Sequence, residues 1–237
     1  MLTPQNAQNV ARIAGFAYLA IFVLAIAANF FVFMPLGVSG DAAATAANIA
    51  AEPFFRAGVA AFMLVLIADI IVGWALFVVL RPADANLALL VVLFRAAYTI
   101  AHIGVVLNLL SALNFASSPD FAGALGEGGF ALAYHFLASH GLGFTVTLIF
   151  FGVHLLLLGV LIARAAYMPT FIGWLVVLAG LAYVADGFGT IMLGSYGPYA
   201  DVAALAVFGP AVVGEAALMI WLMVVGIDKK RFPQPVP

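Results

Sequence analysis

Long apolar segments alternate with short polar stretches along this chain. Six of the segments are each long enough to cross about 30 Å of hydrocarbon, which takes about 20 helical residues. They are predicted at residues 12–34, 54–80, 86–113, 140–163, 170–193 and 202–227. Proline interrupts the apolar pattern between segments, at Pro35, Pro82, Pro119 and Pro169. The pattern predicts an all-α integral membrane protein, a six-transmembrane-helix bundle that forms a single transmembrane domain over residues 1–237.

Two connections, 35–53 and 115–132, are longer than the others. The first contains an alanine-rich stretch that follows Asp41, whose carboxylate can accept hydrogen bonds from free N–H groups in the first turn of a helix. We therefore expect a short capped helix there. Residues 130–139 are expected to form a further short helix on the surface, before the fourth span.

The positions of Lys and Arg predict how the spans are oriented. With the N-terminus inside the cell, six basic residues lie on the cytoplasmic side, and only Arg56 lies near the outer face. The six are Arg12, Arg81, Arg164, Lys229, Lys230 and Arg231. Because short cytoplasmic loops carry an excess of positive residues, we expect a multi-pass protein of the bacterial inner membrane with both termini in the cytoplasm. Ala25-Ile26-Ala27 also resembles a signal-peptide cleavage site, but the apolar run continues to Met34, which favours an uncleaved span.

Small residues recur every seven positions in the fourth and fifth spans. They are Thr145, Gly152, Gly159 and Ala166 in one, and Gly173, Gly180, Gly187 and Gly194 in the other. A period of seven keeps such a stripe on one helix face, and small residues allow two helix backbones to approach closely in lipid. The stripes therefore predict a tight antiparallel pair and carry no functional implication.

Composition narrows the class further. The chain is 67% hydrophobic and 8% charged, whereas a soluble domain carries about 25% charged residues. The lipid bilayer is therefore the expected partner. A net charge of −2 without a basic stripe argues against a nucleic-acid partner. The absence of cysteine excludes disulfides, thiolate metal sites and cysteine nucleophiles.

Polar residues inside or at the mouth of the apolar segments are the candidates for ligand binding or proton exchange. They are Asp69, Arg95, Tyr98, His102, His140, His154, Tyr183, Asp186 and Glu215. Charges within spans are rare, face the bundle interior and mark substrate paths or structural pairs. Asp69, Arg95 and Glu215 fall within about 6 Å of the midplane at 1.5 Å per residue. These depths predict a polar cavity that ends near mid-membrane.

Charge pairing and a proline add two expectations. We expect Arg95 to hold one ionised acid, either Asp69 or Glu215, because an unpaired guanidinium in hydrocarbon is costly. An acid left without a cation could carry a proton. Pro210, which lies inside the sixth span, is expected to kink the helix beside Glu215, as in the broken helices of transporter sites.

Several short motifs also point to a family. They are Ala11-Arg12-Ile13-Ala14-Gly15 with Tyr18, the loop 40–49, Phe94-Arg95, the run 150–159, Tyr167-Met168-Pro169, Ile172-Gly173-Trp174-Leu175 and Ala179-Gly180-Leu181-Ala182-Tyr183. Together they resemble the bacterial membrane proteins catalogued as domain of unknown function 4386. The resemblance covers nearly the whole chain and implies a six-helix inner-membrane protein without implying an activity. Arg95, His140, His154 and Asp186 fall at positions that look like family motif positions.

Three functional hypotheses remain open. The leading one is binding or transport of a small or lipophilic molecule through the polar cavity, where Arg95 would balance an acidic group and Glu215 or Asp186 would exchange protons. The second is a haem- or metal-dependent intramembrane enzyme that uses His102, His140 or His154. It is disfavoured because His102 and His154 differ in depth by about 9 Å and no HExxH motif occurs. The third is a structural accessory subunit of a membrane complex. No catalytic residue and no metal ligand is assigned.

Overall fold

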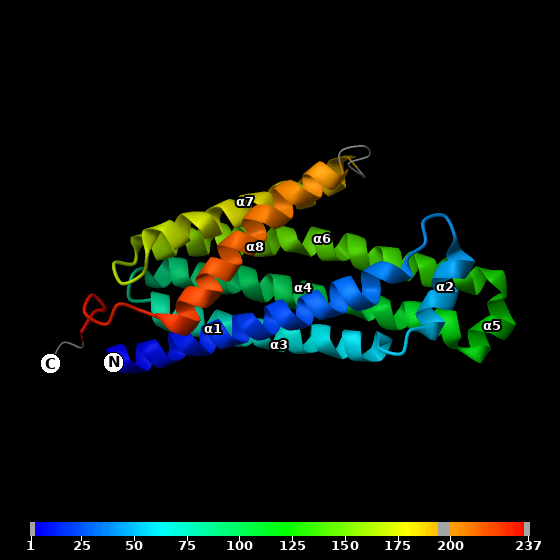
Figure 1. Cartoon of the computed structure of the whole chain (residues 1–237), viewed down its shortest axis with the longest axis horizontal. Helices are drawn as coiled ribbons and strands as arrows, with labels where there is room; N and C mark the ends of the chain where they lie inside the picture. The colour runs from blue at the N-terminus through cyan, green and yellow to red at the C-terminus, as the bar shows by residue number, and fades with distance from the viewer. Residues whose placement is uncertain (1–2, 194–199, 235–237) are drawn as a thin grey trace. The chain divides into compact units, whose positions relative to one another are not determined.

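The fold is entirely helical in the part of the chain that the computed structural model describes, residues 3–193 and 200–234 (Figure 1). The helices are α1 (Pro4–Ile26), α2 (Ala42–Ala51), α3 (Phe55–Leu80), α4 (Ala85–Ser117), α5 (Pro119–Leu125), α6 (Glu127–Arg164), α7 (Thr170–Leu193) and α8 (Ala200–Val224). Six helices in this part of the chain are long and apolar enough to cross a membrane. The predicted all-α class with six spans is confirmed.

The boundaries agree best where turn signals are strong. The predicted fifth span coincides with α7, and the second begins one residue before α3. The prediction of a separate surface helix at 130–139 is wrong, because α6 runs without interruption from Glu127 to Arg164. No proline breaks this stretch, so backbone hydrogen bonding continues into the span. Helix α8 continues through Pro210, and the kink expected there stays a prediction.

The first span has an irregularity that the apolar pattern did not indicate. After α1 the chain continues as a π-helical segment, Ala27–Phe33, and then as a 3₁₀ turn, Met34–Leu36. π-helical turns are rare and occur frequently at functional sites. The capped helix expected after Asp41 is confirmed as α2, because the Asp41 carboxylate accepts a hydrogen bond of 2.8 Å from the Ala44 amide.

Contacts group the chain into two compact units. Unit 1 comprises residues 1–19, 68–99 and 145–237, and unit 2 comprises residues 20–67 and 100–144. The ranges divide α1, α3, α4 and α6, so each of these helices contributes one part to each unit. The two units are described separately below.

Glycine contacts hold the helices of unit 1 together. A Cβ placed on Gly180 of α7 would lie 2.6 Å from the carbonyl oxygen of Gly152 on α6, and one on Gly173 would lie 2.6 Å from that of Gly159. The predicted close pair of spans is confirmed at these positions, while Gly194 lies outside the described residues. Helix α8 packs on α7 in the same way, since a Cβ on Gly214 would lie 2.6 Å from the Leu175 carbonyl oxygen.

The two end segments of the chain also meet in unit 1. The side chain of Gln8 in α1 donates a hydrogen bond to the Val225 carbonyl (2.7 Å) and accepts one from the Ile227 amide (3.0 Å). Lys229 donates to Gln5 (2.8 Å). The start of α1 and the segment after α8 therefore lie at the same end of unit 1.

Unit 2 is built on aromatic and aliphatic packing. The rings of Phe33 and Phe62 stack with centroids 5.5 Å apart, and Phe33 meets Phe55 edge-on at 5.2 Å. The buried cluster around them includes Ala28, Leu36, Ile49, Val59, Leu66, Val106, Leu109 and Ala112. This core places the π-helical segment against α2, α3 and α4.

The exposed side chains of the spans are largely apolar. On α7, for example, Phe171, Trp174, Leu178 and Leu181 are each at least half exposed. A surface of this kind is stable in hydrocarbon and not in water. The lipid bilayer is therefore the environment of these helices.

The contact between α6 and α7 gives the first prediction. Gly180→Val should lower the unfolding free energy by about 1–3 kcal/mol, because the new side chain clashes with backbone atoms of Gly152 and Leu156 on α6. Gly104→Val on α4 is the matched control, since nothing lies within 4 Å of a Cβ there. Thermal or detergent-induced unfolding of the two purified variants measures the difference. Equal stability of the two variants would contradict the prediction.

Candidate functional site

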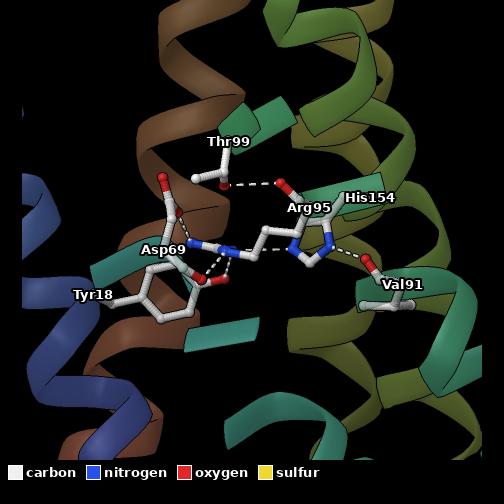
Figure 2. Close-up of polar contacts among 6 residues, drawn as sticks. All are labelled: Tyr18, Asp69, Val91, Arg95, Thr99 and His154. Atoms are coloured by element: carbon white, nitrogen blue, oxygen red, sulfur yellow. Dashed lines mark hydrogen bonds and ion pairs between the residues drawn. The ribbon is translucent and has the colours of Figure 1, made fainter. Parts of the chain in front are cut away.

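Arg95 lies at the centre of a buried polar cluster in unit 1 (Figure 2). Its guanidinium forms an ion pair with the carboxylate of Asp69, and its Nε donates to the Asp69 backbone carbonyl at 3.0 Å. Nη1 donates to the Tyr18 hydroxyl at 2.9 Å and contacts Nε2 of His154 at 3.1 Å. One donor from Nε, two from Nη1 and one from Nη2 make four of the five that arginine offers. Protein groups thus satisfy nearly all of the guanidinium.

The network fixes the tautomer of His154. A guanidinium can only donate, so Nε2 of His154 accepts the hydrogen bond from Arg95. A backbone carbonyl can only accept, so Nδ1 carries the proton that is shared with the Val91 carbonyl at 2.8 Å. Both ring nitrogens are therefore engaged. His154 has no lone pair left for a metal or a haem iron in this arrangement.

Two aromatic rings lie against the guanidinium. Its central carbon lies 5.0 Å from the centroid of the Tyr18 ring and 5.3 Å from that of Phe151. The exposed fraction is 1% for Arg95, 2% for Asp69 and 0% for His154. Cation–π contact strengthens in such a desolvated place. The cluster is closed, and the ion pair expected for Arg95 is formed with Asp69.

The hairpin between α3 and α4 explains why these two residues meet. Asp69 lies 11 residues before the end of α3 at Leu80, and Arg95 lies 10 residues after the start of α4 at Ala85. The two helices are antiparallel and share one turn. Because Asp69 and Arg95 lie at similar distances from that turn, they reach the same depth along the helix pair. Asp84 sets the start of α4, because its carboxylate accepts from the Leu87 amide at 3.0 Å.

Glu215 and Tyr183 form a second polar contact in unit 1. The Tyr183 hydroxyl donates to the Glu215 carboxyl at 2.8 Å, and Glu215 is 8% exposed. The Phe151 ring connects this pair to the arginine cluster, since it lies 5.7 Å from the Tyr183 ring and 5.3 Å from the central carbon of the Arg95 guanidinium. The Tyr98 ring lies 5.0 Å from the same Phe151 ring. No carboxylate–cation pair among the described residues includes Glu215. Asp186, also on α7, is only partly buried.

His102 and His140 belong to unit 2, so the structure divides the predicted polar constellation between the units. Their ring centroids are 6.4 Å apart, and the rings of Phe62 and Phe144 pack against both. Nδ1 of His140 lies 3.2 Å from the Val105 carbonyl, which can only accept, so this nitrogen carries the proton. In the neutral ring Nε2 is then an acceptor. Nε2 of His140 is buried and has no hydrogen-bond partner in the described part of the chain.

A pocket of about 330 Å³ borders this histidine. It is lined by Asn29, Phe33, Met34, Gly37, Val38, Ser39, Tyr134, Leu137, Ala138, His140 and Gly141. The π-helical segment supplies Asn29 and Phe33, and the first half of α6 supplies Tyr134 and His140. Pockets for small ligands have volumes of about 300–1,000 Å³ and are mostly apolar with a few polar groups. This pocket meets that description.

The described residues contain no group of three or more His, Asp or Glu side chains arranged to hold a metal ion. Sequence reasoning also missed some contributors. Tyr18 was part of the N-terminal family motif but was not assigned to the site, because it lies in an otherwise apolar run. Val91 and Val105 act through backbone carbonyls, which no side-chain pattern reveals. The pocket itself depends on the π-helical segment, which was not expected.

The helices and the closed charge network define a multi-pass helical membrane protein with a polar interior. A family model described as "Domain of unknown function (DUF4386)" matches residues 13–226. The chain therefore belongs to this family, as its motifs indicated. A protein of Archaeoglobus fulgidus described as "Uncharacterized protein" is 29% identical over 163 residues, which cover 69% of this chain and 80% of that protein. No solved structure matches the chain.

The buried ion pair gives the second prediction. Arg95→Met leaves Asp69 without its cation, which should cost about 3–5 kcal/mol of unfolding free energy. The double variant Asp69→Leu/Arg95→Met removes both charges and should recover at least about half of that loss. Chemical unfolding in mixed micelles compares the two variants.

The surface pair of Arg164 and Asp84 provides the control. Its N–O distance is 3.6 Å and the Arg164 side chain is 62% exposed, so Arg164→Met should cost less than about 1 kcal/mol. If the double variant is as unstable as Arg95→Met, the charge pair is not the cause of the loss.

Proposed function

We propose that this protein binds a small lipophilic molecule that carries a hydrogen-bond donor such as a hydroxyl group, and that the binding site is the pocket beside His140. The observation that supports this is the coincidence of an apolar pocket of about 330 Å³ with a buried imidazole nitrogen that lacks a partner. A buried polar atom without a hydrogen bond costs about 1–3 kcal/mol, and a ligand that donates to it recovers that cost.

The chemistry of His140 defines the ligand class. Its Nδ1 is committed to the Val105 carbonyl, so a neutral ring presents only the Nε2 lone pair. An alcohol or phenol can donate to this lone pair, whereas an ether or ester cannot. Phe33, Val38 and Leu137, which line the pocket, favour an apolar body for the same molecule.

Access to Nε2 requires a local movement, since the atom is buried. Phe33 is the lining residue suited to this, because its ring centroid lies 6.0 Å from that of His140. Phe33 ends the π-helical segment, and conversion of a π turn to an α turn rotates the side chains that follow it. We therefore assign the ring of Phe33 as the element that moves when a ligand binds.

The proposal is one of binding rather than transport or catalysis. Asp69 and Arg95, two of the charged residues that a transport path at mid-membrane would use, are bonded to one another, and Glu215 is bonded to Tyr183. The orientation of His140 by a backbone carbonyl also suits a metal or haem ligand, and this is the second candidate. It would use His140 with His102, whose ring centroid is 6.4 Å away.

We also propose a plasma-membrane location with both termini in the cytoplasm. The six basic residues of the short loops and ends support this orientation against Arg56 alone. The connection between the first two spans, which contains α2 and lines the pocket at Gly37, Val38 and Ser39, is then on the outer side.

The third prediction tests the ligand class with a matched pair of probes. The full-length protein in nanodiscs should bind 4-tert-butylphenol at least about tenfold more tightly than its methyl ether, which has the same apolar body without the donor. His140→Phe should abolish this preference. His135→Phe, an exposed histidine on the same helix, should preserve it.

Equal binding of the phenol and the ether by the unsubstituted protein would contradict the proposal. An absorption spectrum of the same sample separates the second candidate. A Soret band that is lost in His140→Phe would assign the histidine to haem and overturn the hydroxyl-ligand proposal.

The fourth prediction tests orientation. The chain contains no cysteine, so single-cysteine variants can be labelled without background. In intact cells a membrane-impermeant maleimide should label Ala43→Cys, on the exposed face of α2, and should label Gln234→Cys only after lysis. The reverse pattern would invert the proposed topology.

A further inference from the structure

A second pocket lies in unit 1, where the two end segments of the chain meet, and it is independent of the pocket beside His140. Its volume is about 640 Å³. It is lined by Gln8, Ala166, Tyr167, Met168, Pro169, Trp221, Val225 and residues 227–231. The loop between α6 and α7 forms one wall, and the segment after α8 forms the other.

The wall after α8 is held in a defined conformation. Gly226 has a φ of +75°, and a Cβ there would lie 2.7 Å from the Gln8 side chain that bonds to its neighbours. The Asp228 amide donates to the Tyr167 carbonyl at 3.0 Å. The Phe232 ring meets the Tyr167 ring edge-on at 4.8 Å. The pocket is therefore built by specific contacts of the segment after α8 with the start of α1 and with the loop between α6 and α7.

Three consecutive cations line the pocket. They are Lys229, Lys230 and Arg231, and Asp228 is the single anion of this segment, so its charge is three minus one, or +2. Asp228 pairs with Arg231, with Nε and Oδ2 3.5 Å apart. No ion pair within the described ranges includes Lys229 or Lys230. The Lys229 ammonium donates to Gln5 and keeps two further N–H donors, so both ammonium groups can donate to an anion.

Two aromatic residues of the pocket, Trp221 and Tyr167, indicate its depth in the membrane. Trp221 lies in the last turn of α8, and its Nε1 donates to the Gly226 carbonyl at 3.1 Å. Tyr167 lies between two spans and donates to the Val79 carbonyl at 2.9 Å. Burial raises the pKa of Tyr167 above its ordinary value, so its hydroxyl stays neutral. Trp and Tyr of this kind lie at the headgroup level of a membrane, where cations next to a span attract anionic lipids.

We propose that this pocket is a binding site for the phosphate headgroup of an anionic phospholipid. Lys229 and Lys230 contact the phosphate, with the partly neutralised Arg231 at its edge. Trp221 packs against the glycerol and the upper acyl chain. The lipid thereby joins the segment after α8 to the loop between α6 and α7, and it stabilises the contact between the two ends of the chain.

The test compares lipid retention by two charge-matched triple variants. Full-length protein in detergent is titrated with phosphatidylglycerol or phosphatidylcholine, and bound lipid is counted by native mass spectrometry. Lys229→Gln/Lys230→Gln/Arg231→Gln should weaken phosphatidylglycerol binding by about 100-fold, roughly fivefold per cation. Arg12→Gln/Arg81→Gln/Arg164→Gln removes three exposed cations that do not line the pocket, and it should change binding by less than about threefold because exposed charges that do not contact the phosphate are screened by salt.

Three outcomes would overturn the proposal. Equal retention of phosphatidylglycerol and phosphatidylcholine would show that charge does not select the lipid. Equal losses in the two triple variants would show that net charge acts without a site. Displacement of phosphatidylglycerol by millimolar inorganic phosphate, with no dependence on acyl chains, would assign the pocket to a free anion. Size-exclusion profiles and circular dichroism of both variants confirm that each is folded, since the substituted side chains are exposed.

Discussion

A charged or polar group inside hydrocarbon must find its partner within the protein, and unit 1 is organised around this constraint. Arg95 is the clearest case, because its guanidinium is bonded to Asp69, Tyr18 and His154 and covered by two aromatic rings. Four helices supply these groups, so the position of one arginine constrains α1, α3, α4 and α6 together. We interpret the cluster as the structural centre of unit 1.

His154 and His140 have the same tautomer but different surroundings. Both rings donate from Nδ1 to a backbone carbonyl, so the protein fixes the same tautomer twice. In His154 the second nitrogen is occupied by Arg95, and the site is complete. In His140 the second nitrogen is left without a partner beside a pocket. The same side chain thus completes a polar cluster in one unit, and in the other it is the residue that we propose binds a ligand.

Small residues and irregular backbone have complementary roles in this fold. Gly152, Gly173 and Gly180 bring α6 and α7 into backbone contact, which makes that part of unit 1 tightly packed. The π-helical segment Ala27–Phe33 has the opposite effect in unit 2, because two of its residues, Asn29 and Phe33, help to line a pocket.

Membrane association follows from the family match and from the six apolar helices.

The sequence by itself determined the helical class, the number of spans and the glycine contact. These follow from composition and from periods of seven residues, which are local properties of the chain. It also indicated that Arg95 pairs with an acid near mid-membrane. Only the tertiary structure decided that the acid is Asp69, and that His154 lies in a different unit from His102 and His140. It also showed that residues 130–139, predicted as a separate surface helix, are part of α6. Partners such as the Val91 and Val105 carbonyls exist only where separate helices meet, so no sequence pattern can reveal them.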